Sequence, residues 1–223
     1  VTYNDTPKDT DVIVERCRDA DIIITNKVQI SAEVIAHLPK LKLIQLTATG
    51  MNNVDHDACD KHDGALYNVA GYAVKSVPEH TFMLMLTAMR AGIHYHQKVA
   101  DGTWLANGNF CLLDIPLIDL EDKTLGIIGI GTIGKRVTEI ARAFGMTVLW
   151  AEHQGRPPRS DEYTAFDDML AQADVISLHC PLNEQTEHLI NKDTLAKMSK
   201  QPLIVNVARG SVVDSQALTD AIN

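Results

Sequence analysis

Short apolar runs alternate with amphipathic stretches from the first residues of this chain of 223 residues. In the N-terminal part the runs predict strands at residues 1–3, 21–25, 43–47 and 65–69, and the amphipathic stretches predict helices near 10–19, 31–38 and 54–62. Strands that are apolar almost throughout are typical of parallel sheets covered on both faces. Strict alternation of strand and helix therefore predicts an α/β fold.

Residues 76–98 have the pattern of one long helix with apolar side chains on nearly every side. A helix that is apolar all round is buried, so we expect it to lie between two domains or two subunits. A core helix inside a single domain is an equally good interpretation. Residues 99–123 contain Gly102, Gly108 and Pro116 without a sustained period, and they predict an irregular linker.

A second alternating array follows the linker. Its predicted strands cover residues 125–130, 147–152, 174–180 and 202–208, with a weak one near Tyr163–Thr164, and its predicted helices cover 132–144, 167–172, 191–199 and 214–222. We therefore predict two α/β domains with parallel sheets, residues 1–98 and residues 99–223. Ligand sites favour the cleft between such domains.

Composition excludes several classes of function. With Lys+Arg 20 and Asp+Glu 29 the net charge is −9, which argues against nucleic acid and anionic membrane surfaces as partners. No segment approaches the ~18 apolar residues of a membrane span. The four cysteines form no C-x-x-C pair, so we expect reduced thiols and a cytoplasmic protein. His94 and His96 do not share a helix face, and we predict no metal site.

The most informative motif is G-x-G-x-x-G at Gly129, Gly131 and Gly134. It ends an apolar strand, opens an amphipathic helix, and is followed after 18 residues by Glu152 at the end of the next strand. In this context the motif predicts a dinucleotide site. Gly129 permits the tight turn, Gly131 lets the backbone approach a pyrophosphate, and Gly134 allows the helix to pack closely on the strand.

Glu152 and the loop after it bear on the choice of cofactor. The N–H groups of Thr132 and Ile133 are expected to face the phosphates. Glu152 is expected to accept both hydroxyls of the adenosine ribose, which favours NAD over NADP. Arg156 and Arg159 follow closely and could bind a 2′-phosphate. Because a carboxylate repels that phosphate, NAD remains the preferred cofactor.

Arg209 directly follows the apolar strand at 202–208. Ligands of open parallel sheets bind beyond the carboxyl ends of the strands, so we expect Arg209 to point at the cofactor crevice. A guanidinium can bind an α-keto acid through two parallel hydrogen bonds and polarise its carbonyl. A surface ion pair is the alternative for Arg209. Asp214 is expected to cap the last helix.

Five ordered segments together resemble the D-isomer-specific 2-hydroxyacid dehydrogenases: residues 48–55, 76–81, the glycine motif, 177–182 and 206–210. Residues 151–155 and 114–117 are most similar to the glycerate dehydrogenase (hydroxypyruvate reductase) branch. The resemblance implies a flavodoxin-like substrate domain hinged to a Rossmann domain that binds NAD. It also implies hydride transfer to or from a small 2-hydroxy or 2-keto acid, with glycerate/hydroxypyruvate or glyoxylate favoured, and a homodimer.

The resemblance further implies a role for individual residues. Arg209 matches the catalytic and substrate-binding arginine, and Thr49 and Gly50 match the loop that receives the substrate carboxylate. The positions that match cofactor-binding residues, in addition to those of the glycine motif and Glu152, are Val77 and Thr81 near the nicotinamide, His179, Cys180, Pro181 and Thr186 around the adenosine and phosphates, and Val207 and Ala208.

The resemblance also implies segments that this sequence does not contain. Members of the family have a strand before the position of Val1, a sixth strand after Asn223, and a carboxylate and a histidine on or after that strand. We therefore expect a fragment of a longer dehydrogenase with little activity alone. The alternative function is a dinucleotide-sensing, corepressor-like binding module on the same fold.

Overall fold

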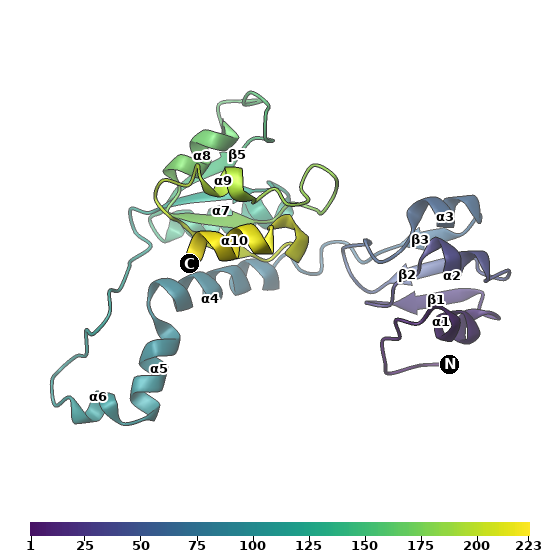
Figure 1. Cartoon of the computed structure of the whole chain (residues 1–223), viewed down its shortest axis with the longest axis horizontal. Coiled ribbons are helices and arrows are strands. Elements are labelled where there is room, and N and C mark those ends of the chain that lie inside the picture. Colours follow the sequence, from purple (N-terminus) through teal and green to yellow (C-terminus); the bar gives the residue numbers. More distant parts are fainter. The chain divides into compact units, whose positions relative to one another are not determined.

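The computed structural model describes residues 1–223, which form two compact units, Val1–Tyr72 and Ala73–Asn223. Each unit is an α/β arrangement on a parallel sheet, as the sequence predicts (Figure 1). The division lies after Tyr72, whereas the sequence predicts it after residue 98. The reason is that α4 (Ser76–Met89) packs Phe82, Met85 and Met89 into the core of the second unit.

The first unit contains a three-stranded sheet with three helices. In sheet order the strands are β1 (Ile22–Thr25), β2 (Leu43–Leu46) and β3 (Ala65–Tyr67), and the helices are α1 (Thr10–Cys17), α2 (Ala32–Ala36) and α3 (His56–Lys61). Each helix begins at a side chain that accepts a backbone N–H bond, from Asp9, Ser31 and Asp55 respectively. Such caps satisfy donors that the first turn leaves unpaired.

The strand predicted at residues 1–3 is wrong, because these residues have no regular structure. Val1 is fully exposed, and Tyr3 lies under the guanidinium of Arg16, 4.3 Å from the ring centroid. All three residues of this run are exposed, so the run contributes nothing to the core of the unit. The core of this unit lies on the other strands, where Ile23, Ile44 and Leu46 pack against the helices.

The second unit has a five-stranded parallel sheet in the order β6-β5-β4-β7-β8. The strands are β4 (Thr124–Ile128), β5 (Thr147–Ala151), β6 (Tyr163–Thr164), β7 (Val175–Leu178) and β8 (Leu203–Asn206). The chain starts in the middle at β4, adds β5 and β6 on one side, and then adds β7 and β8 on the other. This is the order of a Rossmann sheet, which leaves a crevice at the switch point beyond the carboxyl ends of β4 and β7.

Alternating side chains of β4 separate the two faces of this sheet. Leu125 and Ile127 pack with α4 and with α7 (Thr132–Ala143). Ile128 packs on the opposite face, with α8 (Phe166–Gln172), and a Cβ at Gly126 would overlap with Met169 of that helix. Two further helices, α9 (Lys192–Leu195) and α10 (Ser215–Ile222), follow β7 and β8, and Asp214 caps α10 as predicted.

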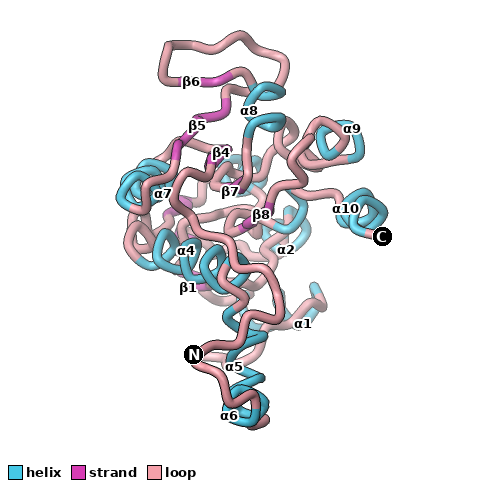
Figure 2. The backbone as a smooth tube through the Cα atoms, turned by 90° about the vertical axis from the view of Figure 1, so that its left-hand side faces the viewer, coloured by secondary structure: helices cyan, strands magenta, loops and turns pink.

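The segment predicted as one helix over residues 76–98 is two helices. The helix α4 ends at Met89, and α5 (Gly92–Ala100) begins after Ala91, which is left-handed with φ 54°. A short α6 (Thr103–Ala106) lies in the predicted linker. The break falls where the buried face of the segment ends. Met89 is the last buried residue of α4, and α5 has no buried residue. Figures 1 and 2 both show α5 and α6 projecting from the sheet of the second unit.

Only one side of α4 is buried within its unit. Phe82 stacks on Phe144 at the end of α7, with ring centroids 5.3 Å apart. Met83 and Leu84 on the other side are 47% and 37% exposed. The apolar surface of α4 is therefore larger than the part of it that the second unit buries. No helix in the chain is long and apolar enough to cross a membrane.

Candidate functional site

A cavity of about 600 Å³ opens beyond the carboxyl ends of β4, β5 and β7, at the switch point of the second sheet. The residues that line it come from the glycine turn, the end of β5 with its following loop, and the end of β7 with its following loop. Those named by the sequence analysis are Gly129, Gly131, Glu152, Arg156, Arg159, His179, Cys180, Pro181 and Thr186. The sheet topology thus brings together residues that lie more than 50 positions apart in the chain.

Each of the three glycines of the turn is explained by a different structural feature. Gly129 has φ +98°, and a Cβ there would lie 2.5 Å from the backbone nitrogen of Cys180. Gly134 lies against the backbone of Gly129, and a Cβ would overlap with the carbonyl oxygen of that residue. A Cβ at Gly131 would meet nothing within 4 Å. Gly129 and Gly134 are therefore required by packing, whereas Gly131 leaves open space for a ligand.

The N-terminus of α7 follows this open space. Gly131 is its N-cap, and no side chain caps this end. The exposed Thr132 and the half-buried Ile133 form the first turn of the helix, and Thr132 lines a neighbouring hollow with Lys135 and Arg136. Backbone N–H groups and the helix dipole favour an anion at this position, and Lys135 adds a positive charge, whereas Arg136 is paired with Glu139, which lines the same hollow.

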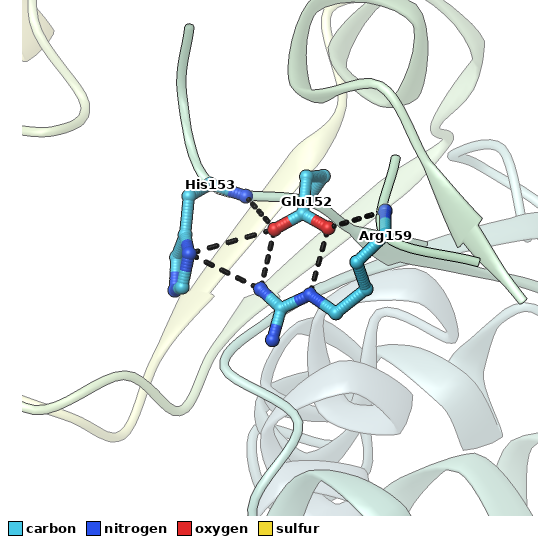
Figure 3. Close-up of polar contacts among 3 residues, drawn as sticks. All are labelled: Glu152, His153 and Arg159. Atoms are coloured by element: carbon cyan, nitrogen blue, oxygen red, sulfur yellow. Dashed lines mark hydrogen bonds and ion pairs between the residues drawn. The ribbon is translucent and has the colours of Figure 1, made fainter. Parts of the chain in front are cut away.

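Glu152 lies at the end of β5 with its side chain only 2% exposed. Its Oε1 accepts hydrogen bonds from the backbone N–H of His153 at 2.7 Å and from Nη2 of Arg159. Its Oε2 accepts from the backbone N–H of Arg159 at 2.9 Å and from Nε of Arg159 at 2.7 Å (Figure 3). These contacts, with the guanidinium first, hold the pKa of Glu152 far below its usual range. The carboxylate is therefore ionised and paired.

Arg159 is itself positioned by aromatic side chains. Its guanidinium carbon lies 4.5 Å from the ring centroid of Tyr163, and Tyr163 contacts Trp150 edge to face. The indole Nε1 of Trp150 donates to the buried hydroxyl of Thr138 in α7. The loop between β5 and β6 is thereby held to the sheet through side chains from β5, β6 and α7.

The wall formed by the end of β7 contains an unpaired polar atom. His179 Nε2 lies 2.8 Å from Ser177 Oγ, whereas His179 Nδ1 is buried and has no hydrogen-bond partner. Burial lowers the pKa of His179 to about 4, so the ring is neutral at pH 7. After Cys180, the hydroxyl of Thr186 donates to the carbonyl of Pro181 at 2.6 Å and closes the loop.

Arg209 follows β8, the edge strand next to β7, and does not line the cavity. The side chain of Asn206 accepts a bond from the backbone N–H of Ala208 at 3.0 Å and donates to the carbonyl of Arg209 at 2.9 Å. This clamp sets the turn that presents the exposed Arg209. Val207 and Ala208 are half-buried within the same turn.

Thr49 and Gly50 belong to the first unit, in the loop after β2. Thr49 Oγ1 donates to the carbonyl of Val69 at 3.1 Å, and the carbonyl of Thr49 accepts from Asn68 at 2.7 Å. In the second unit, Thr81 is fully buried, and its hydroxyl donates to the carbonyl of Val77 within α4. The hydroxyl of Thr81 is therefore already paired, and its side chain reaches no solvent.

Three features of this site are missing from the predictions made from the sequence. Asn206 clamps the turn before Arg209, Tyr163 supports Arg159, and Arg159 pairs with Glu152. The pairing of Asn206 with residues two and three positions ahead is an Asx-type turn, so the sequence Asn-x-x-Arg could have indicated it. The other two contacts join different strands and a loop, and only the fold brings them together.

Comparison with known proteins agrees with this geometry. The family model of the D-isomer specific 2-hydroxyacid dehydrogenase, NAD binding domain, matches residues 82–223. The glycerate dehydrogenase of Methylorubrum extorquens is 39% identical over 94% of this chain and 66% of its own length. The hydroxypyruvate reductase of Blautia hydrogenotrophica is 37% identical over 96% of this chain and 68% of its own length.

A solved structure has the same fold. The D-lactate dehydrogenase of Aquifex aeolicus, in complex with NAD and lactic acid, superposes with a TM-score of 0.82 at 33% identity over 94% of this chain and 62% of its own. The chain spans about two thirds of the length of the curated relatives that it matches. The family model covers more than half of the chain, so this chain belongs to the D-isomer specific 2-hydroxyacid dehydrogenases and contains their NAD-binding domain.

Proposed function

We propose that this protein is an NAD-dependent dehydrogenase that transfers a hydride between the nicotinamide ring and C2 of a small 2-hydroxy or 2-keto acid. One observation carries the proposal: the carboxyl edge of one sheet holds both the glycine-turn cavity and Arg209, which follows β8, the strand next to β7. The cavity suits a dinucleotide, and the guanidinium suits the carboxylate of the acid.

The residues of the cavity fit NAD on two grounds. The open space at Gly131 admits a pyrophosphate close to the backbone, and His179 Nδ1 is a buried polar atom that lacks a partner. In this proposal Gly131, Thr132 and Ile133 hold the pyrophosphate, and Glu152 receives the adenosine ribose. His179, Cys180, Pro181 and Thr186 form the wall beside the adenosine. The bound cofactor would supply the hydride for reduction and accept it in the reverse reaction, while the C2 oxygen would gain or lose one proton.

Arg209 acts on the acid. Its guanidinium binds the substrate carboxylate through two parallel bonds and draws electron density from the C2 carbonyl, which makes C2 a better hydride acceptor. The Asn206 clamp keeps the Arg209 turn in place. Thr49 and Gly50 lie in the first unit, the proposed flavodoxin-like substrate domain, and their loop is proposed to bind the substrate carboxylate. The names of the relatives favour hydroxypyruvate/glycerate or glyoxylate as substrates.

We also propose that the protein is a cytoplasmic homodimer. The α5–α6 surface, defined here by Ile93, Val99, Leu105, Phe110 and Leu113, supports the dimer because these five side chains are between 62% and 100% exposed. The helices α5 and α6 contact each other, and large exposed apolar residues on adjoining elements favour a protein interface. Neither nucleic acid nor membrane is proposed as a partner, since the charge balance is acidic.

The test is a kinetic assay on the complete protein that follows NADH oxidation with hydroxypyruvate, glyoxylate and pyruvate, and the reverse reaction with D- and L-glycerate. We expect turnover with hydroxypyruvate or glyoxylate, and use of the D isomer only. If NADH binds but no 2-keto acid is reduced, the dehydrogenase assignment is wrong and a dinucleotide-sensing module becomes the better interpretation.

A further inference from the structure

The carboxylate of Glu152 has no free acceptor site. Each of its two oxygens already accepts two hydrogen bonds, one from a backbone N–H and one from the guanidinium of Arg159. A carboxylate offers about four lone-pair sites in total. A ribose hydroxyl can therefore donate to Glu152 only after one of the present donors leaves.

The donor that can leave is the guanidinium. The two backbone N–H groups belong to His153 and Arg159, and they move only with the loop. The Arg159 side chain is 49% exposed and can rotate into solvent. Its Nε and Nη2 bind one carboxylate oxygen each, which is also the way a vicinal diol donates to a carboxylate. The guanidinium of Arg159 and the ribose diol therefore compete for the same two oxygens.

The charges around the cavity are cationic apart from Glu152. Glu152 is the one carboxylate among the lining residues, whereas Arg156 and Arg159 both line the cavity. With Glu152 covered by Arg159, the carboxylate repels a 2′-phosphate less than an unpaired carboxylate does. A guanidinium released from Glu152 stays close enough to bind that phosphate, and Tyr163 supports it.

We infer that Arg159 is the residue that determines how strongly this site discriminates between NAD and NADP. It competes with the ribose diol of NAD for Glu152, and it offers a cation to the 2′-phosphate of NADP. Both effects reduce the difference in affinity between NAD and NADP. The inference rests on the proposed function, because it assumes that the cavity binds the adenosine half of a dinucleotide.

The experiment measures dissociation constants rather than turnover. NADH and NADPH are titrated by fluorescence, and 5′-AMP and adenosine 2′,5′-bisphosphate by calorimetry, because the latter pair probes the adenosine half alone. For the unmodified protein we expect NADH to bind more tightly than NADPH by less than about tenfold. Arg159→Ala should tighten NADH and weaken NADPH, and widen their ratio by about tenfold or more, the effect of one charged hydrogen bond.

Arg156→Ala is the matched control. It removes the same charge from the same loop and cavity, but Arg156 forms no hydrogen bond or ion pair with Glu152. Its loss frees no carboxylate oxygen, so we expect no gain in affinity for NADH or 5′-AMP. An equal gain in both variants would show that general charge, and not the contact with Glu152, sets the affinity, and would overturn the inference.

A second variant separates loss of the contact with Glu152 from loss of the loop structure. Arg159→Lys keeps the positive charge but cannot bridge both oxygens of Glu152. We expect NADH to bind more tightly and NADPH to bind as before, so the ratio widens less than in Arg159→Ala. An unchanged or smaller ratio in both variants contradicts the role of Arg159. Failure of the unmodified protein to bind either cofactor contradicts the proposed function itself.

Discussion

Gly134 packs so closely on Gly129 that a Cβ atom at Gly134 would overlap with the carbonyl oxygen of Gly129. This contact joins the first turn of α7 to the end of β4, and it holds the glycine turn beneath the cavity. The neighbouring Gly131 has no such contact. The two positions therefore separate the packing role of the glycine motif from its binding role.

Gly134→Ala should destabilise the protein by roughly 1–3 kcal/mol, the usual cost of forcing one extra carbon into a packed site. The methyl group cannot be accommodated by a flexible side chain, since the neighbour is backbone. Urea unfolding followed by circular dichroism measures the change. Unaltered stability would mean that α7 can shift away from β4 without cost.

Gly131→Ala should leave stability within about 0.5 kcal/mol of the original, as for a substitution without packing consequences. Its φ of −89° and ψ of −165° suit any residue, and the methyl group meets no atom within 4 Å. The same methyl group occupies the space through which a pyrophosphate approaches the backbone. We expect the affinity for NADH to fall by about tenfold or more. Fluorescence titration measures this affinity, with Gly134→Ala titrated for comparison at a temperature where both variants are folded.

In the complete protein, Arg209→Lys should lower kcat/KM for the 2-keto acid by about tenfold or more, because an ammonium group cannot replace a planar pair of donors. NADH affinity should change little, since Arg209 does not line the cavity. Steady-state kinetics and NADH titration on the same preparation check both parts. Kinetics equal to those of the unmodified enzyme would remove Arg209 from the substrate site.

Stability should fall as the pH decreases from about 6.5 to about 4. Burial lowers the pKa of His179 to about 4 in the folded protein, whereas an unfolded histidine titrates near 6.5. Between these values the unfolded chain binds a proton that the folded chain does not, which favours unfolding by up to about 3 kcal/mol. Denaturant titrations across this pH range measure the slope, and His179→Gln should flatten it. An equally steep slope in that variant would assign the effect to other groups.

Phe110→Asp should convert a dimer into a monomer, because it places a charge in the most exposed apolar position of the α5–α6 surface. Asn109→Asp is the matched control, since it adds the same charge one residue away and removes no apolar area. Light scattering coupled to size-exclusion chromatography gives the mass of each variant. If both variants keep the mass of the unmodified protein, another surface forms the dimer or the protein is monomeric.

Local sequence alone determines the α/β class, most of the elements and the place of the dinucleotide site. The dinucleotide motif is one continuous segment: the strand from Thr124 to Ile128, the three glycines, and the helix that starts at Thr132. Neighbouring residues are therefore enough to predict it. Parallel strands must place their carboxyl ends at one edge, and this rule extends the prediction to Glu152, whereas the family resemblance extends it to His179; both line the same cavity.

Tertiary packing alone decides where the long apolar segment at 76–98 breaks and to which unit it belongs. Its pattern continues past Met89, but the core that buries it ends there, and Ala91 takes a left-handed conformation. The short apolar run at residues 1–3 has no neighbouring strand and remains irregular. The period of apolar residues in a sequence indicates which residues can be buried. Whether they are buried depends on the surface that packs against them in the fold.

The contact between Glu152 and Arg159 is the clearest case of what only the fold determines. Sequence reasoning assigns them opposite preferences, the carboxylate for NAD and the guanidinium for NADP. In the structure the loop between β5 and β6 folds back, Tyr163 supports the guanidinium, and the two charges neutralise each other. Seven positions of irregular chain separate them, and no local period predicts such a return. The two residues are each readable from the sequence, but their pairing depends on the tertiary structure.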